Sequence, residues 1–175
     1  ATNRSYTLTA GTTSSIDVTT PATNLTISGA STNTTGALTK LGSGTLTLSG
    51  ANLYTGLTTV NAGTLRYGIA NALSTGAVTV NDGGTFDLAG FSDSIGALTV
   101  NSGATGGTVT TGAGTLTLTG NITSTGGAAN ASISGNLAFG ATRTITTTNA
   151  ADGLNVSAVI SGAGGLTKSG TGTVT

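Results

Sequence analysis

The chain has 175 residues, a formal net charge of zero, five Lys or Arg residues, five Asp and no His or Cys. This composition gives no electrostatic footprint for nucleic acid or an anionic membrane, and it offers few groups for acid–base or nucleophilic catalysis. No stretch approaches the roughly 20 apolar residues of a membrane span, so we expect no membrane insertion of this segment. The sequence opens without Met or a signal peptide, which predicts a mature or excised piece.

Short segments in which apolar and polar residues alternate run along the whole chain and predict β-strands. Gly, Asn, Asp and Ser between them are typical of turns. No segment has a 3.6-residue apolar stripe, so the fold class we predict is all-β. The expected strands cover residues 6–9, 25–28, 45–49, 58–60, 78–80, 85–88, 98–100, 115–119, 132–134, 143–147 and 155–158.

A repeat in strict register lies in the middle of the chain. TTVNAG begins at Thr58, VTVNDG at Val78 and LTVNSG at Leu98, so the pattern returns every 20 residues. A fixed period of this length indicates stacked coils. We therefore predict a parallel β-helix (β-solenoid) over residues 1–175, with about 20 residues and three short strands per coil. At a stacking distance of roughly 4.8 Å, eight or nine coils would form a rod about 40 Å long.

Alternation within the strands separates an interior from a surface, because successive side chains point to opposite faces. Threonines between the apolar residues are expected outside. The residues expected in the core are Leu46, Leu48, Val60, Val78, Val80, Phe86, Leu88, Leu98, Val100, Leu116 and Leu118.

One corner of the solenoid is expected to carry a ladder of stacked amides with glycines two residues later. The glycines would supply the positive φ that turns the corner. The residues of this ladder are Asn61, Asn81 and Asn101, followed by Gly63, Gly83 and Gly103.

Residues 42–68 read GSGTLTLSGANLYTGLTTVNAGTLRYG, which resembles the autotransporter-associated β-strand repeat. Leu53 and Leu57 replace the commoner Thr and Gly. Weaker copies follow at 76–88, 96–109 and 112–121, and LTKSGTGTVT at 166–175 repeats LTKLGSGTLT at 38–47. The resemblance implies a right-handed parallel β-helix in the passenger region of a Gram-negative autotransporter or a related large surface protein.

Such passengers commonly serve as stalks or adhesive shafts. The resemblance thus implies an extracellular, non-catalytic segment at the bacterial surface, outer membrane-anchored or secreted. Its expected partners are a host surface, matrix or carbohydrate. We expect no nucleic acid, cofactor or metal.

The densest acidic group is Asp82, Asp87 and Asp93. We interpret these residues as solvated acids on turns and outer faces. A calcium site at Asp82 and Asp87 is a weaker alternative, since NDGGTFDLAG lacks the nonapeptide pattern of calcium-binding β-rolls. Tyr54 is expected to pack within its own loop rather than to stack on sugar.

Two further hypotheses stay open. Thr-x-Thr pairs such as Thr45 with Thr47 suggest an ice-binding or carbohydrate-binding β-solenoid, although the 20-residue units carry single threonines. The strand-like sequence at both ends predicts continuation into further repeats or end-to-end self-association into a filament.

Overall fold

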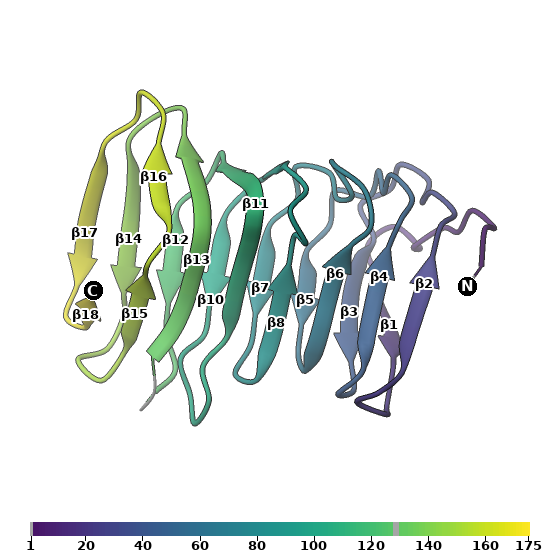
Figure 1. Ribbon diagram of the computed structural model, residues 1–175, viewed down its shortest axis with the longest axis horizontal. Helices are drawn as coiled ribbons and strands as arrows, with labels where there is room; N and C mark the ends of the chain where they lie inside the picture. Colours follow the sequence, from purple (N-terminus) through teal and green to yellow (C-terminus); the bar gives the residue numbers. More distant parts are fainter. Residues whose placement is uncertain (1, 128–129) are drawn as a thin grey trace.

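The computed structural model describes residues 2–127 and 130–175, and these form an elongated stack of parallel strands without a helix (Figure 1). The strands are β1 (Thr13–Asp17), β2 (Asn24–Ile27), β3 (Ala37–Leu41), β4 (Thr45–Leu48), β5 (Thr58–Val60), β6 (Gly63–Tyr67), β7 (Val78–Val80), β8 (Gly84–Asp87), β9 (Asp93–Ile95), β10 (Leu98–Val100), β11 (Thr108–Leu118), β12 (Ile122–Ser124), β13 (Asn130–Phe139), β14 (Arg143–Thr147), β15 (Gly153–Val156), β16 (Val159–Ser161), β17 (Leu166–Gly170) and β18 (Thr173–Val174).

Two long parallel sheets run along the axis of the stack. One has eight strands in the order β1-β3-β5-β7-β10-β12-β14-β17, and the other has ten, with β9 and β16 pairing beside β11 and β13. Each strand of the first sheet is followed along the chain by a strand of the second. This arrangement confirms the predicted β-solenoid, with about seven turns and about 23 residues per turn.

The 20-residue register is a local property of the central coils. Thr58 pairs with Val78, and Val78 with Leu98. Elsewhere the turns are longer: Ser14 pairs with Leu38, and Leu98 with Ile122, at spacings of 24 residues. The rod therefore has about seven turns instead of the eight or nine that a uniform 20-residue coil would give.

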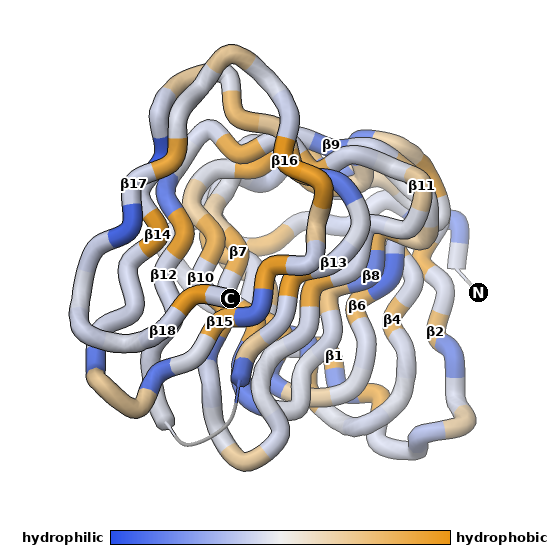
Figure 2. The backbone as a smooth tube through the Cα atoms, turned by 60° about the vertical axis from the view of Figure 1, so that its left-hand side comes forward, coloured by the Kyte–Doolittle hydropathy of each residue, from blue (hydrophilic) through white to orange (hydrophobic). Residues whose placement is uncertain are grey.

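The interior is a set of stacked apolar columns. Val60, Val80 and Val100 pair directly with one another and are all fully buried. In Figure 2 the hydrophobic segments recur at the same place on successive coils. Of the residues expected in the core, Val78 is 1% exposed, and Leu46, Leu48, Val60, Val80, Phe86, Leu88, Leu98, Val100, Leu116 and Leu118 are each 0% exposed.

Two columns of side chains face each other across the interior, and the size of their residues changes in opposite directions along the rod. At the central coils valines lie close to glycines; a Cβ on Gly107 would lie 3.2 Å from Cγ1 of Val100. Further along, the valine column continues as Ser124 and Thr147, while the glycine column continues as Ala131 and Leu154. Small residues on one side thus accompany larger residues on the other, which preserves dense packing.

Some predicted strands differ from the structure. Residues 6–9 do not form a strand, although Tyr6 makes an isolated parallel bridge with Ser31. The strand ranges expected from the sequence did not include β1, β3, β6, β9, β12, β16, β17 or β18. Among residues 2–127 and 130–175, a third strand per coil occurs only where β9 pairs with the second half of β11 and β16 with the second half of β13. Elsewhere irregular turns form that side of the described coils.

Candidate functional site: corners and faces of the solenoid

The asparagine corner forms a continuous amide ladder over three coils. The side-chain Nδ2 of Asn81 donates to Oδ1 of Asn61, and Nδ2 of Asn101 donates to Oδ1 of Asn81 at 2.7 Å. Their backbone amides donate to carbonyls of the preceding coil. Oδ1 of Asn101 is buried without a partner among the described residues, so the ladder ends there.

The glycines of this corner fall into two groups. Gly63 and Gly83 have φ angles of +61° and +75°, as the turn requires. Gly103 does not have a positive φ, which corrects the expectation for this residue. The third turn is longer, and its positive φ of +78° falls on Gly106 instead.

Gly103 is needed for a different reason, namely a close approach to the preceding coil. A Cβ at this position would lie 2.3 Å from Cγ of Asp82. The Asp82 carboxylate accepts hydrogen bonds from the backbone N–H groups of Ala104, Thr105 and Gly106, at 3.0, 2.8 and 2.6 Å. The donors at Thr105 and Gly106 in particular hold the pKa of Asp82 below its usual value.

The other two acids of the predicted group lie elsewhere. Asp87 is half-buried on the outer face, where Oδ2 lies 3.6 Å from Nε of Arg66 on the neighbouring strand. Asp93 is buried rather than solvated, which corrects that expectation. Its oxygens accept the N–H groups of Leu73 and Ser94 at 3.1 and 2.7 Å, and burial raises its pKa.

These acids do not converge. No group of three or more potential metal-ligating side chains, and no pocket, occurs within residues 2–127 and 130–175. The carboxylate of Asp82 is already engaged by backbone donors, whereas Asp87 faces a guanidinium. Among the described residues, the two carboxylates considered for a calcium site therefore have separate partners.

Two buried charged residues, Lys40 and Asp152, hold turns together, and neither role was predicted from the sequence. Nζ of Lys40 donates to the carbonyls of Leu41, Gly42 and Ala62 at 2.7, 2.8 and 3.2 Å, and Lys40 is 0% exposed. Burial lowers its pKa, and the nearby carboxylate of Asp17 opposes this shift. The burial of Lys40 could have been predicted from alternation, since Lys40 follows the core residue Leu38 by two positions and therefore points to the same face of the strand.

Asp152 links three coils near the C-terminal end. It is 1% exposed and accepts hydrogen bonds from N–H of Asn149 and Gly127 and from the hydroxyl of Ser102. Burial opposes its ionisation, but these donors hold its pKa below the usual value. A lone Asp in a turn carries no sequence signal for such a role.

An unbroken threonine column lies on the outer face of the eight-stranded sheet. Strands β3, β5, β7, β10 and β12 have no outward-facing charge. The hydroxyls of this column make no hydrogen bond to other described residues, whereas on the other sheet Thr47 donates to Asn24 and Ser132 donates to Thr108. In strand order the column is Ser15, Thr39, Thr59, Thr79, Thr99, Thr123, Thr146 and Ser169.

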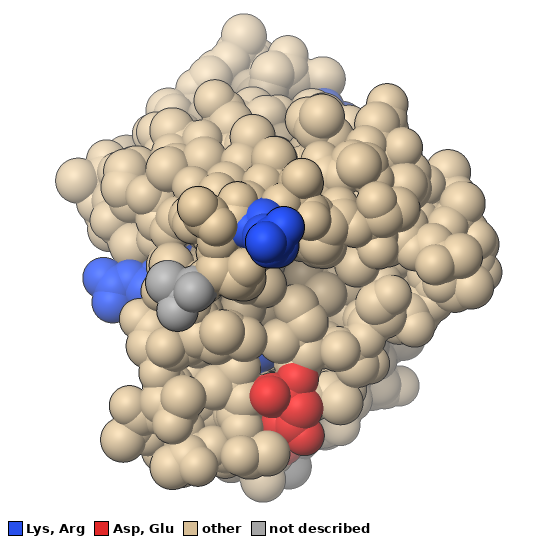
Figure 3. Space-filling view, turned by 90° about the vertical axis from the view of Figure 1, so that its right-hand side faces the viewer, with Lys and Arg blue, Asp and Glu red and all other residues tan. Residues whose placement is uncertain are grey.

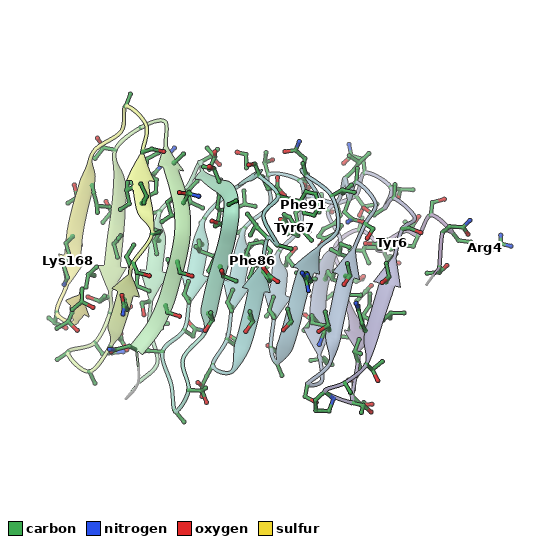
Figure 4. All side chains as sticks on the ribbon, viewed as in Figure 1. Arg4, Tyr6, Tyr67, Phe86, Phe91 and Lys168 are labelled. Atoms are coloured by element: carbon green, nitrogen blue, oxygen red, sulfur yellow. The ribbon has the colours of Figure 1, made fainter. Side chains whose placement is uncertain are left out.

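Aromatic side chains are mostly interior. Tyr54 is 2% exposed, and its hydroxyl lies 2.9 Å from Oγ1 of Thr58. Tyr67 and Phe86 pack edge to face with ring centroids 5.3 Å apart (Figure 4). Phe91 is 37% exposed, and it is the most exposed aromatic among the described residues.

Comparison with known proteins identifies the central segment. A family model, the passenger-associated-transport-repeat, matches residues 38–66. The chain contains an autotransporter passenger repeat. This repeat includes β3 to β5, most of β6 and the buried Lys40.

A longer stretch resembles a surface protein. Over 71 residues the chain is 51% identical to the adhesin BmaC autotransporter of Brucella suis biovar 1 (strain 1330). The match covers 41% of this chain but 2% of that protein. No solved structure matches. The described residues include no helix long and apolar enough to cross a membrane.

Proposed function

We propose that this chain is a non-catalytic section of a bacterial surface stalk or adhesin shaft. The observation that carries the proposal is the passenger repeat set in two continuous parallel sheets. Each coil hydrogen-bonds to the next through its backbone, so axial load is spread over the whole stack. A rod of this kind can hold a binding tip away from the cell.

A direct mechanical test uses the purified 175-residue chain pulled along its axis between its two ends. A stalk should yield in successive steps, each releasing about one coil of chain, since each coil pairs through its backbone only with its neighbours. Extension at low force without steps would refute the proposal. The absence of catalysis is tested separately: release of sugar from any polysaccharide, lost in Asp82→Asn, would contradict it.

Adhesion by the shaft itself is supported by the threonine column. Its hydroxyls have no hydrogen-bond partner among the described residues, β-branching restricts the χ1 rotamers of its six threonines, and no charge interrupts strands β3 to β12. Many weak polar contacts along one face can add up to binding through multivalency. We expect beads coated with the chain to adhere to decellularised matrix, and Thr59→Asp, Thr79→Asp and Thr99→Asp together to reduce retention. The same three changes on the other sheet, at the register partners Thr45, Thr64 and Thr85, provide the control.

A second candidate is binding to an ordered surface such as ice. Single residues of successive strands form a continuous column through eight strands, with Thr at six positions and Ser15 and Ser169 at the ends. Sugar recognition by stacking finds less support, because Phe91 alone among the aromatic residues reaches 37% exposure in the described chain. Inhibition of ice recrystallisation by the chain, lost in Thr79→Asp, would favour this function. Retention on crystalline cellulose or chitin would favour the carbohydrate alternative.

A further inference from the structure

The outer face of the eight-stranded sheet carries three columns of side chains that run along the rod from β5 to β10. The middle one is the threonine column. Two residues later in each coil follows the asparagine ladder at the corner. Two residues earlier stand Leu57, Ala77 and Ala97, whose carbonyls accept N–H groups of the preceding coil at equivalent positions. The face is therefore ordered into an apolar, a hydroxyl and an amide column.

One large side chain rises from the apolar column. Leu57 is 44% exposed, and its neighbours in the column are the alanines Ala37, Ala77 and Ala97. Contact with a partner would remove this leucine from water, which is favourable. Strands β3, β5, β7, β10 and β12 have no outward-facing charge to oppose such a contact. The view of the N-terminal end of the rod likewise shows only scattered charges (Figure 3).

We propose that this face pairs with the same face of a second copy of the chain, with the two rods antiparallel about a two-fold axis that lies along the strands between β5 and β7. Leu57 of each copy then lies over Ala77 of the other, and Thr59 lies opposite Thr79, since a two-fold axis repeats every contact. The inference rests on the proposed stalk function and adds a partner, because antiparallel pairing joins shafts that project from two facing surfaces.

The exposed leucine determines where the axis lies. With the axis between β5 and β7, Leu57 and Ala77 of both copies meet in one apolar cluster, and each leucine fills the space above an alanine. An axis through β5 would set the two leucines directly against each other and hold the remaining columns apart, whereas interfaces pack densely. An axis through β7 would separate the leucines and place Ala37 against the polar Asn121, which follows Ala97 in the same column.

The direction of the second copy follows from the order of the columns. Antiparallel rods place like columns opposite each other, so apolar, hydroxyl and amide groups each meet their own kind. Among the described residues the ladder uses only Oδ1 of Asn61, and its Nδ2 can donate to Oδ1 of Asn81 in the second copy. Parallel rods would instead set Leu57 against the amide ladder, and burying amides against a side chain without hydrogen-bonding groups is unfavourable.

The contact has the size of a weak association. Six strands of each copy overlap, from β1 to β12. At roughly 4.8 Å between strands and roughly 3.3 Å per residue, a face about five residues wide covers about 500 Å² per copy. A total of about 1,000 Å² lies at the lower limit for a specific interface. Pairing therefore depends on the high local concentration that many shafts on one surface provide.

Sedimentation velocity of the 175-residue chain from about 10 μM to about 1 mM tests the pairing. We expect a monomer–dimer equilibrium that Leu57→Asp weakens at least about tenfold, because it places an unpaired charge in the contact. Leu57→Ala, which only shortens the side chain, should also weaken it. Leu53→Asp is the matched control, since Leu53 is 52% exposed in the same turn but lies outside the sheet. Circular dichroism confirms that each variant is folded.

Cross-linking tests the orientation, because the chain has no Cys and a single introduced cysteine is therefore a specific reporter. Thr39 lies opposite Thr99 of the second copy in the antiparallel pair, whereas in a parallel pair each lies opposite itself. A short bismaleimide should link a mixture of Thr39→Cys and Thr99→Cys chains at least about tenfold faster than either variant alone.

Three outcomes would overturn the proposal. The chain could stay monomeric over the whole concentration range, or pairing could survive Leu57→Asp or be lost equally in Leu53→Asp. Faster linkage of Thr39→Cys with itself than with Thr99→Cys would show parallel rods instead. The pulling experiment uses single chains and needs no pairing, so failure of the pairing proposal and failure of the stalk proposal can be distinguished.

Discussion

Replacing Lys40 by Met should destabilise the solenoid, although the site is surrounded by apolar columns. Met keeps most of the side-chain volume and fills the space between Ile16 and Val60, with which Lys40 is in register. What it removes is the ammonium that bridges two coils through the carbonyls of Gly42 and Ala62. The substitution therefore separates the charge from the packing.

The size of the effect follows from the contacts. Three charge-assisted hydrogen bonds are each worth about 1.5–3 kcal/mol. Taking an ammonium out of water costs several kcal/mol, and burial indeed lowers the pKa of Lys40. Leu41 loses little, because its carbonyl also accepts the N–H of Val18 at 3.1 Å. We expect a net loss of about 2 kcal/mol, or about 4–8 °C in Tm for a chain of this length.

Urea unfolding followed by circular dichroism measures this loss, and Lys168→Met is the matched control. Lys168 makes the same contact to the second following carbonyl but lies exposed, so its replacement should change stability by no more than about 0.5 kcal/mol. Equal effects of the two substitutions, or a stabilised Lys40→Met, would refute the reasoning and show that burial of the charge outweighs its hydrogen bonds.

Four further outcomes are expected. Thr147→Val should stabilise the fold by about 1 kcal/mol, because it removes a fully buried hydroxyl without a partner among the described residues, whereas Thr146→Val on the outer face should be nearly neutral in urea unfolding. Asn81→Ala should cost about 1–2 kcal/mol by removing both ladder bonds; an unchanged urea midpoint would contradict this. Ala89→Gly should raise Tm, since Ala89 has a φ of +51° and gains about 0.5–1 kcal/mol on relief of that conformation. Burial raises the pKa of Asp93 above 3.8, so wild-type stability should fall as pH rises from 3.8 through the folded-state pKa; Asp93→Asn should flatten this dependence between pH 4 and 7.

The architecture could be predicted from the sequence where the two-residue alternation of the strands fits into a constant 20-residue coil. Val60, Val80 and Val100 recur at both periods, and the structure pairs them directly. The average coil length could not be read from these residues. Turn insertions such as 103–105 lengthen a coil without disturbing the strands, because Ala104 and Thr105 lie exposed at the corner.

The interactions of charged residues were harder to predict than their positions. Alternation placed Asp87 on the outer face, where the structure also has it. Asp93 begins a short strand after a turn, and its carboxylate accepts the N–H groups of Leu73 and Ser94 in the interior. Leu73 belongs to the preceding coil, so the sequence around Asp93 does not show that its side chain is buried. Asp82 meets a turn 22 to 24 residues further along the chain. Partners that depend on coil stacking become visible only once the register of each coil is known.

The corners of this solenoid differ in kind from its columns, and this difference explains how one repeat tolerates so much variation. A column needs side-chain volume rather than a specific partner, so Val100 can give way to Ser124 if Gly107 gives way to Ala131 across the interior. A corner must satisfy specific donors and acceptors between adjacent coils. Asn81 does so with amides, Lys40 with an ammonium and Asp152 with a carboxylate. Because each of these interactions joins a coil only to nearby coils, one can replace another along the rod without changing the parallel backbone pairing between coils.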